Sequence, residues 1–292
     1  MDGKIPGFTD GTAEVNGQTI AYSRGGEGPP LLLLHGFPQT RAMWRGIAGQ
    51  LARDHTVITA DLRGYGDSSA PVGAGQMTFR KMAADQVALM EALGFGRFHL
   101  AGHDRGARTA HRLGLDHGER LLSLTLMDIV PTHLLLTGLT AEVAAAYYHW
   151  FFLAQPAPFP ETMIGADPDL YYERCLLGFG KAELSDFDAG ALELYRESWR
   201  RERTIAAMCD DYRAALTLDL EDDAADLERM VGCPALVLYG AQGAMARYYD
   251  VPGTWADRLE NMQAEAIPGG HFFVEQSPGE TLAAMRGFLG RL

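Results

Sequence analysis

The most informative stretch of this sequence is Gly102-His103-Asp104-Arg105-Gly106. The short apolar run 97–101 before it predicts a buried strand, and residues 107–113 after it predict a helix, so the pentad is the turn between the two. A glycine on each side allows a sharp bend that lifts the side chain of Asp104 out of the turn, as in a nucleophile elbow. A carboxylate there suits displacement at a saturated carbon, which makes an alkyl ester that water later cleaves. Taken alone, the turn is also compatible with Asp104 as a helix N-cap.

The composition limits the class of protein and its partners. The chain has 292 residues, 47% hydrophobic and 22% charged, which is ordinary for a globular protein of one or two domains. Its formal net charge of −13 argues against nucleic acid and anionic membranes as partners. Three widely spaced cysteines (Cys175, Cys209 and Cys233) indicate a reducing compartment without a disulfide framework. The N-terminus lacks a signal-peptide pattern, and the apolar run 143–154 is too short to span a membrane, so we expect a cytoplasmic protein.

The alternation of expected strands and helices predicts an α/β fold with a mostly parallel sheet flanked by helices. The expected strands are a hairpin over 13–22 around Asn16-Gly17, then 31–34, 55–60, 97–101, 121–127, 235–239 and 263–267. Residues 131–226 carry many aromatic residues and helix formers but no β-rich run, and a last helix is expected over 273–289. We therefore expect a core made of residues 1–131 and 226–292, interrupted by a helical cap over 132–225.

Displacement by Asp104 needs a base for the second step and an acid that orients this base. Of the nine histidines, His271 is the one that follows the last expected strand, where the loops of the sheet converge on the pentad. Asp128 follows the strand before the cap, directly beside the pentad strand. Asp250 is the alternative acid, because in serine hydrolases of this architecture the acid usually follows the strand after the insertion. We expect Asp104, His271 and Asp128 to act together.

Two further groups of residues suit a small anionic substrate. Attack of water on the ester creates an oxyanion, for which the amides of Arg105 and Phe37 are the expected N–H donors. Arg105 and Arg108 are one helical turn apart, so both guanidiniums can face one small carboxylate. The alternative interpretations are a simple tight turn at Phe37 and a solvated pair of helix arginines.

Several motifs of the chain together resemble those of the fluoroacetate dehalogenases, enzymes of the α/β-hydrolase fold related to haloalkane dehalogenases and epoxide hydrolases. Besides the pentad, the motifs are His35-Gly36-Phe37-Pro38-Gln39, Asp61-Leu62-Arg63-Gly64-Tyr65-Gly66, Asp128-Ile129-Val130-Pro131-Thr132, His149-Trp150 and Gly269-Gly270-His271-Phe272. The resemblance covers nearly the whole chain. It implies that Asp104, His271 and Asp128 are the nucleophile, base and acid of a catalytic triad.

The same resemblance implies the residues that bind the substrate. Arg105 and Arg108 would form a clamp for its carboxylate. A halide pocket would consist of His149, Trp150 and Tyr212, for which ordinary helix-core packing is the alternative interpretation. The resemblance implies neither a metal nor a cofactor, but it does imply that the protein forms a homodimer.

The implied reaction is hydrolytic dehalogenation of small 2-haloacids, which converts fluoroacetate or another haloacetate to glycolate and halide. One alternative is an epoxide hydrolase with the same triad, in which cap tyrosines act as acids. The other is a non-catalytic small-molecule receptor, which would be expected to have lost part of the triad. Phe179, Ala107 and Gly118 depart from the usual family pattern and leave the substrate range open.

Overall fold

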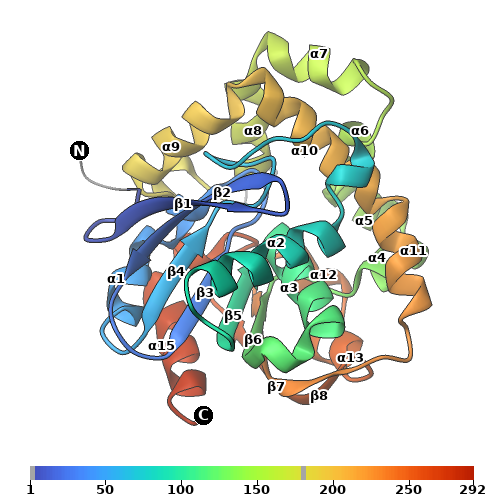
Figure 1. The fold of residues 1–292 in the computed structure, drawn as a ribbon. Helices are drawn as coiled ribbons and strands as arrows, with labels where there is room; N and C mark the ends of the chain where they lie inside the picture. The colour runs from blue at the N-terminus through green and yellow to red at the C-terminus, as the bar shows by residue number, and fades with distance from the viewer. Residues whose placement is uncertain (1–3, 179–181) are drawn as a thin grey trace.

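The computed structural model describes residues 4–178 and 182–292, and within these ranges one eight-stranded sheet forms the centre of the molecule (Figure 1). The strand order is β1-β2-β4-β3-β5-β6-β7-β8. The strands are β1 Thr9–Val15, β2 Gln18–Gly25, β3 Pro30–Leu34, β4 Thr56–Ala60, β5 Phe98–His103, β6 Leu121–Met127, β7 Val231–Gly240 and β8 Leu259–Ile267. Every neighbouring pair from β4 to β8 is parallel, whereas β1–β2 and β2–β4 are antiparallel. The predicted α/β fold with a mostly parallel sheet is therefore confirmed.

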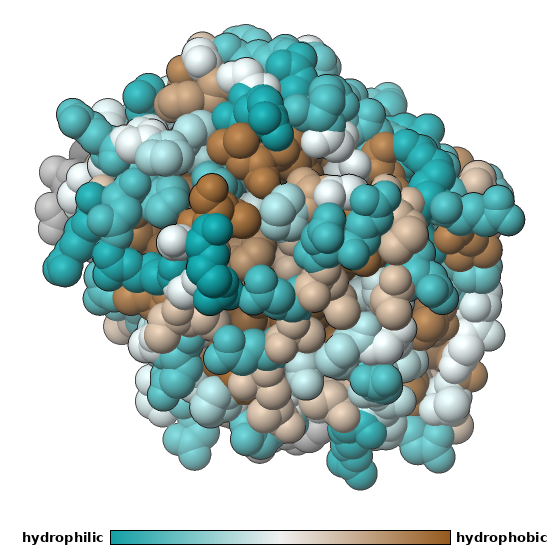
Figure 2. All heavy atoms as spheres, turned by 90° about the horizontal axis from the view of Figure 1, so that it is seen from below, coloured by the Kyte–Doolittle hydropathy of each residue, from teal (hydrophilic) through white to brown (hydrophobic). Residues whose placement is uncertain are grey.

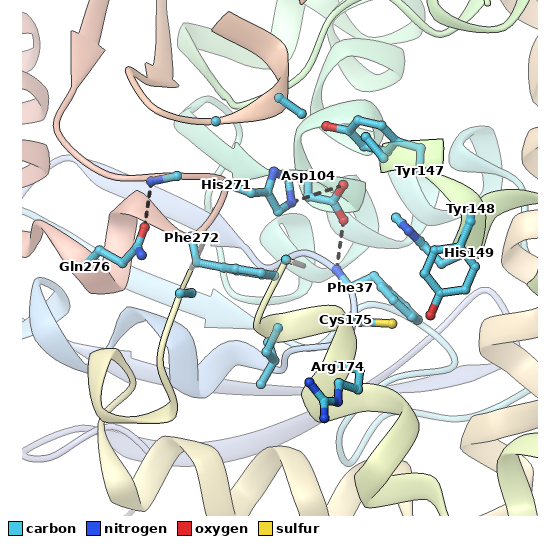
Figure 3. A pocket seen from close by; sticks show the side chains of 17 residues that line it. Phe37, Asp104, Tyr147, Tyr148, His149, Arg174, Cys175, His271, Phe272 and Gln276 are labelled. Atoms are coloured by element: carbon cyan, nitrogen blue, oxygen red, sulfur yellow. Dashed lines mark hydrogen bonds and ion pairs between the residues drawn. The ribbon is translucent and has the colours of Figure 1, made fainter. Parts of the chain in front are cut away.

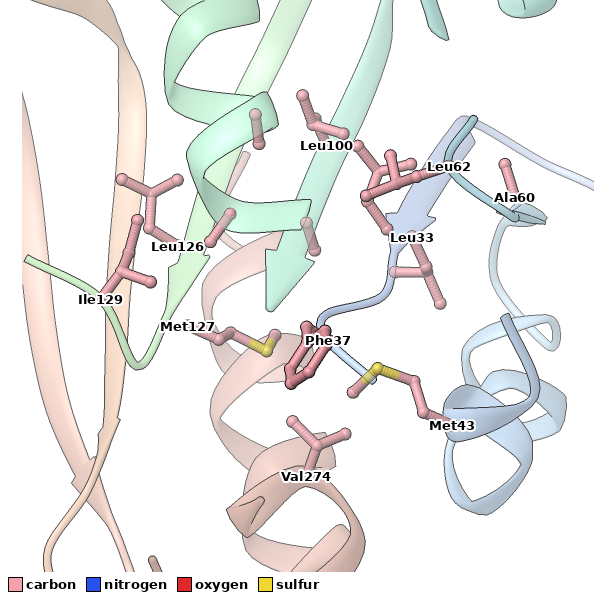
Figure 4. Packing of buried hydrophobic residues seen from close by; sticks show 14 of the residues in the cluster. Leu33, Phe37, Met43, Ala60, Leu62, Leu100, Leu126, Met127, Ile129 and Val274 are labelled. Carbon is pink, nitrogen blue, oxygen red and sulfur yellow. The ribbon is translucent and has the colours of Figure 1, made fainter. Parts of the chain in front are cut away.

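The central strands are apolar because both of their faces are covered. Leu31, Leu32, Leu33 and Leu34 are all buried, and all of β4 and β5 is buried as well. Parallel strands with helices on both faces read as such continuous apolar runs. Around the elbow, Leu33, Leu100 and Leu126 from three adjacent strands belong to the same buried hydrophobic cluster as Phe37 and Met127 (Figure 4). This packing gives the carboxyl ends of β3, β5 and β6 a rigid base.

Helices of the first core segment join the strands. They are η1 Arg41–Gly46, α1 Ala48–Leu51, η2 Ala74–Gln76, α2 Phe79–Ala92, α3 Arg105–Asp116 and η3 Gly118–Arg120. In the second core segment they are α12 Ala244–Tyr248, α13 Val251–Trp255, α14 Phe273–Gln276 and α15 Pro278–Leu289. The prediction of a single last helix over 273–289 is wrong in one respect. The helix breaks at Ser277, because Pro278 has no N–H for a continuing helix but fits the first turn of a new one.

Between β6 and β7 the chain forms helices that lie over the carboxyl ends of the strands (Figure 1). They are α4 Thr132–Thr137, α5 Ala141–Ala146, α6 Tyr148–Leu153, α7 Phe159–Ala166, α8 Pro168–Leu176, η4 Leu184–Asp186, α9 Ala189–Trp199, α10 Glu202–Ala215 and α11 Leu218–Ala225. We propose that residues 132–225 are a cap domain on a core of residues 1–131 and 226–292. Phe179, which departs from the family pattern, lies outside the described residues.

The surface on the side away from the cap is mixed. Figure 2 shows polar and charged side chains spread over this face, with apolar side chains in small groups between them. Within residues 4–178 and 182–292, we find no helix with both the length and the apolar character that crossing a bilayer requires.

Candidate active site

Asp104 occupies the sharp turn between β5 and α3, in a strained conformation with φ 48° and ψ −114°. Gly102 and Gly106, two positions before and after Asp104, must be glycines because the backbone passes too closely for a side chain. A Cβ on Gly106 would lie 2.5 Å from the carbonyl oxygens of Leu34 and His35, and one on Gly102 would lie 2.3 Å from the Gly106 carbonyl oxygen. Strain of this kind is concentrated at functional sites. The turn has the geometry of a nucleophile elbow and lifts the Asp104 carboxylate above the sheet.

His271 and Asp128 meet beside Asp104. His271 lies in the loop after β8, and its Nδ1 is 2.6 Å from Oδ2 of Asp128. The other oxygen, Oδ1, accepts a hydrogen bond of 2.9 Å from the Gly240 amide. Nε2 of His271 lies 3.7 Å from Oδ2 of Asp104 (Figure 3). Asp250, the alternative acid, instead lies at the N-terminus of α13. The three residues expected to act together are thus adjacent in space.

The surroundings of these groups set their charge. Burial by itself would raise the pKa of Asp104, but the nearby His271 and His103 and the Phe37 amide lower it to about 2. Asp104 is therefore ionised. Burial by itself would lower the pKa of His271, but the hydrogen bond and the charge of Asp128 raise it above its ordinary value. His271 is therefore a stronger base than a free imidazole.

A hydrogen bond from the loop after β3 holds one oxygen of the nucleophile. The Phe37 amide donates to Oδ1 of Asp104 over 2.9 Å. Oδ2 of the same carboxylate faces His271. The amide of Arg105, the other expected oxyanion donor, belongs to the first residue of α3 and follows Asp104 directly. Its role as a donor stays a prediction.

Arg105 and Arg108 are buried, so they are not a solvated pair. Nε of Arg105 donates to Oδ2 of Asp211 over 2.9 Å, and its Nη2 donates to the same carboxylate and to the Asp211 carbonyl. Nη1 of Arg108 donates to the Val130 carbonyl over 3.1 Å and to Oγ1 of Thr132 over 2.9 Å. Both guanidiniums lie over the ring of Trp150, with centroid distances of 5.4 Å and 4.8 Å respectively.

The three aromatic residues of the expected halide pocket come together from α6 and α10. The ring of Tyr212 lies 5.6 Å from that of His149, 5.4 Å from that of Trp150 and 5.1 Å from that of Phe37. Burial lowers the pKa of His149 to about 3, so this ring is neutral. Nε1 of Trp150 and the Tyr212 hydroxyl are buried without a hydrogen-bond partner among the described residues.

A cavity of about 90 Å³ opens onto the nucleophile (Figure 3). Asp104, His271, Phe37 and His149 line it, together with other residues that include Tyr147, Tyr148, Arg174 and Cys175. Arg105, Arg108, Trp150 and Tyr212 are not among its lining residues and lie deeper. In the part of the chain that the structure describes, no cluster of histidine, cysteine, aspartate or glutamate residues could hold a metal ion.

Asp211 was not predicted as a residue of this region, whereas Tyr147 is one of the cap tyrosines of the epoxide-hydrolase alternative. Tyr147 lines the cavity, and Asp211 holds Arg105. The sequence contains a weak sign of Asp211, since it directly precedes Tyr212 in the segment Cys209-Asp210-Asp211-Tyr212. However, a carboxylate on a helix has many alternative partners, and nothing in the sequence selects Arg105 as the one.

Comparison with known proteins agrees with the α/β architecture. The family model for the alpha/beta hydrolase fold matches residues 29–278. The chain belongs to the α/β-hydrolase fold family. A solved structure from Nostoc sp. PCC 7120, assigned to the same family, superposes with a TM-score of 0.95 at 45% identity and covers 98% of this chain and 99% of that chain.

Two curated members of the α/β-hydrolase family are similar over almost their whole length. The fluoroacetate dehalogenase of Burkholderia sp. is 51% identical, over 97% of this chain and 94% of that protein. The soluble epoxide hydrolase of Corynebacterium sp. (strain C12) is 30% identical, over 93% of each chain. The resemblance to fluoroacetate dehalogenases inferred from the motifs is thereby confirmed.

Proposed function

We propose that this protein is a hydrolase acting on carbon–halide bonds, which converts small 2-haloacids such as fluoroacetate to the 2-hydroxyacid and halide through an ester on Asp104. The 51% identity to a fluoroacetate dehalogenase supports the reaction class. The observation that carries the proposal is a group of buried donors without partners: Nη1 of Arg105, Nε of Arg108, Nε1 of Trp150 and the hydroxyl of Tyr212.

Buried donors without a hydrogen-bond partner destabilise a protein that has no ligand bound. Each buried polar group that lacks a partner costs about 1–3 kcal/mol, so a concentration of them in one place calls for a ligand rich in acceptors. All four belong to residues that the resemblance had assigned to the carboxylate and the halide. The charge of Asp104 acts on the pKa of both Arg108 and Tyr212, which supports a position of these two donors close to its carboxylate. A carboxylate with a halogen on the next carbon would satisfy them together.

In the first step Asp104 displaces the halide. Oδ1 is held by the Phe37 amide, so Oδ2 is the oxygen that attacks the carbon bearing the halogen. A C–O bond forms as the C–halogen bond breaks, and the bonding electron pair leaves with the halide. Trp150, Tyr212 and His149 donate hydrogen bonds to the departing ion. The product is an ester between Asp104 and the 2-hydroxyacid.

In the second step water cleaves the ester. Nε2 of His271 takes a proton from water, whose oxygen attacks the carbonyl carbon of the Asp104 ester. Asp128 stabilises the resulting imidazolium through its 2.6 Å contact with Nδ1. The Phe37 and Arg105 amides stabilise the oxyanion. Collapse releases the 2-hydroxyacid, which takes the proton from His271, and leaves one oxygen from water in Asp104.

An epoxide hydrolase is the second candidate, because Tyr147 lines the cavity together with Asp104 and one relative is a soluble epoxide hydrolase. A cap tyrosine could protonate the ring oxygen of an epoxide. However, a neutral epoxide gives the buried Arg108 no charge to bind. A receptor without catalysis is disfavoured, since the triad is complete.

The test is release of fluoride from fluoroacetate, with chloroacetate and an unsubstituted terminal epoxide assayed alongside. We expect halide release by the wild type and none by Asp104→Asn. Under single-turnover conditions in ¹⁸O-water, the label should enter Asp104. Asp250→Asn is the matched control and should retain turnover. Label in the glycolate alone, or turnover of the epoxide but not of haloacetates, would refute the proposal.

We further propose that the protein is cytoplasmic and forms a homodimer. The spacing of its three cysteines supports the first and the resemblance supports the second. Size-exclusion chromatography with light scattering measures the mass in solution, and a monomer at micromolar concentration would contradict the homodimer.

A further inference from the structure

The two buried arginines of α3 differ in their charge balance. Arg105 is paired with Asp211, and both side chains are fully buried. The Asp211 carboxylate and carbonyl occupy Nε and Nη2 of Arg105, which leaves Nη1 as the nitrogen without a partner. Tyr65 adds a hydrogen bond of 2.6 Å to Oδ2 of Asp211, so the carboxylate is itself held in place. The Arg105–Asp211 pair is therefore neutral overall and rigidly oriented.

Arg108 has neutral partners instead. Its Nη1 donates to the Val130 carbonyl and to the Thr132 hydroxyl, and no carboxylate lies within ion-pair distance of it among the described residues. Burial lowers the pKa of Arg108, and Asp104 is the main charge that opposes this effect. In contrast, the pKa of Arg105 is raised, because Asp211 outweighs the effect of burial. Arg108 is thus the arginine whose charge is left to act on a ligand.

We propose that the two arginines do different work, and that Asp211 is the positioning residue that separates their tasks. Arg108 balances the negative charge of the substrate, whereas Arg105, held by Asp211, donates one oriented N–H through Nη1. This inference rests on the proposed function, since it assigns the carboxylate site of that reaction. The negative charge of Asp211 balances that of Arg105 and so limits the positive potential near Asp104. The two anionic products, the 2-hydroxyacid and the halide, can then dissociate.

Binding of glycolate, the unreactive product, tests this division by isothermal titration calorimetry. Arg108→Met removes the uncompensated charge and should weaken glycolate binding about 100-fold or more. The double variant Arg105→Met/Asp211→Leu removes a neutral pair and one hydrogen bond, and should weaken binding by about tenfold or less. Equal losses in the two variants, or a larger loss in the double variant, would overturn the proposal.

A buried arginine–aspartate pair away from the site provides the control. Arg63 and Asp85 are also buried and joined by two hydrogen bonds of 2.6 Å. Arg63→Met/Asp85→Leu should leave the affinity for glycolate unchanged. A loss as large as that of the Arg105/Asp211 variant would show that removing any buried pair disturbs binding, and would count against a specific role of Asp211.

A single substitution covers the case in which the double variant does not fold. Asp211→Asn preserves the shape and an acceptor for Tyr65 but removes the compensating charge. Glycolate should then bind several-fold more tightly while haloacetate turnover slows, because Arg105 is less firmly oriented and the products are retained. A purely structural role predicts weaker or unchanged binding, and either result would refute the inference.

The outcomes separate this inference from the proposed function. A wild-type protein that binds glycolate but releases no halide refutes the proposed function, while the comparison of variants still tests the arginines. A wild-type protein that hydrolyses haloacetates, with equal losses in both arginine variants, refutes the inference alone. A wild-type protein that neither binds glycolate nor releases halide refutes both.

Discussion

Asp104 combines a strained backbone, full burial and a low pKa, and each property has a separate cause. The positive φ comes from the turn between β5 and α3, and the ionised state comes from His271, His103 and the Phe37 amide. None of these would hold the carboxylate ready without the others. The roles of the neighbouring residues can therefore be tested one at a time.

Removal of the base should separate the two chemical steps. In His271→Asn, displacement by Asp104 still proceeds, but water is not activated, so the ester should accumulate. We expect one equivalent of halide per site and a modified Asp104 peptide in the mass spectrum. His99→Asn, a buried histidine of β5 that bonds Ser123, should turn over normally. Unmodified protein after the halide burst would contradict the role of His271.

The pH dependence should report the contact between His271 and Asp128. Catalysis needs neutral His271, so the rate of ester hydrolysis should rise with pH through the raised pKa of this residue. Asp128→Asn removes the two largest effects that raise the pKa of His271, the hydrogen bond and the charge of Asp128, and the third, the charge of Asp104, is absent from the ester, while burial still lowers the pKa. The midpoint of the single-turnover profile should therefore move to lower pH, and the plateau should fall. An unchanged midpoint would show that Asp128 does not act on His271.

Trp150→Phe should affect the leaving groups unequally. The substitution keeps an aromatic ring but removes the unpartnered Nε1 of the indole. The departing fluoride gains its negative charge in the transition state, where a donor stabilises it most. Losing such a donor costs about 2.7–4 kcal/mol, so defluorination should fall about 100-fold or more, and chloroacetate turnover much less. Trp44→Phe is the control, since Trp44 is equally buried with an unpartnered Nε1 but belongs to η1 of the core and not to α6. Equal effects on both substrates would show that Trp150 contributes to core packing and not to halide binding.

At the scale of elements, the site depends on how closely α3 approaches β3. The first turn of α3 passes the end of β3 so closely that Gly106 has no room for a Cβ. This close approach brings Asp104, at the N-terminus of α3, within hydrogen-bond distance of the Phe37 amide in the loop after β3. The elbow is thus a packing constraint as well as the proposed position of the nucleophile.

Gly106→Ala should therefore destabilise the fold. The new Cβ meets two backbone carbonyl oxygens at 2.5 Å, and overpacking of this kind costs about 1–3 kcal/mol. We expect a lower midpoint in urea and a reduced turnover. Gly279→Ala, in α15 with no atom near its Cβ, should be neutral or slightly stabilising. A neutral Gly106→Ala would show that the approach of α3 to β3 is adjustable.

At the scale of the whole molecule, Glu275 connects three segments that are distant in sequence. Its carboxyl group accepts hydrogen bonds from the Gln39 amide in the loop after β3 and, over 2.9 Å, from the Tyr195 hydroxyl in α9. Glu275 itself belongs to α14, directly after the His271 loop. Burial of the carboxyl group raises its pKa to about 8, although part of the residue is exposed. The core and the cap helices are joined here through a protonated acid.

This junction should make stability depend on pH. The folded protein keeps Glu275 protonated up to about pH 8, whereas the unfolded chain releases the proton near its ordinary pKa, so wild-type stability is lost as pH rises through this window. Glu275→Gln lacks this loss, so its Tm should increasingly exceed that of the wild type between pH 5 and 8. Glu260→Gln, exposed on β8, is the control. A difference in Tm that does not change with pH would contradict the protonated state.

Local patterns were sufficient to predict the fold and the proximity of Asp104, His271 and Asp128. The apolar run Leu31–Leu34, the Asn16-Gly17 hairpin and the Gly-x-Asp-x-Gly turn each depend on short-range sterics and burial, which neighbouring residues already specify. His271 and Asp128 could be selected because both follow strands, and the carboxyl ends of parallel strands converge at one edge of the sheet. Their positions along the chain therefore implied their proximity.

The tertiary structure alone decided the partners of the buried charges. Asp211 pairs with Arg105 across 106 positions of sequence, and Glu275 reaches Gln39 across 236, and no periodicity connects such positions. Which of two similar arginines receives a counter-charge depends on which carboxylate the cap helix α10 brings to it. That choice follows from the packing of the cap on the core, where burial makes every unpaired charge costly and only three-dimensional proximity can supply the partner.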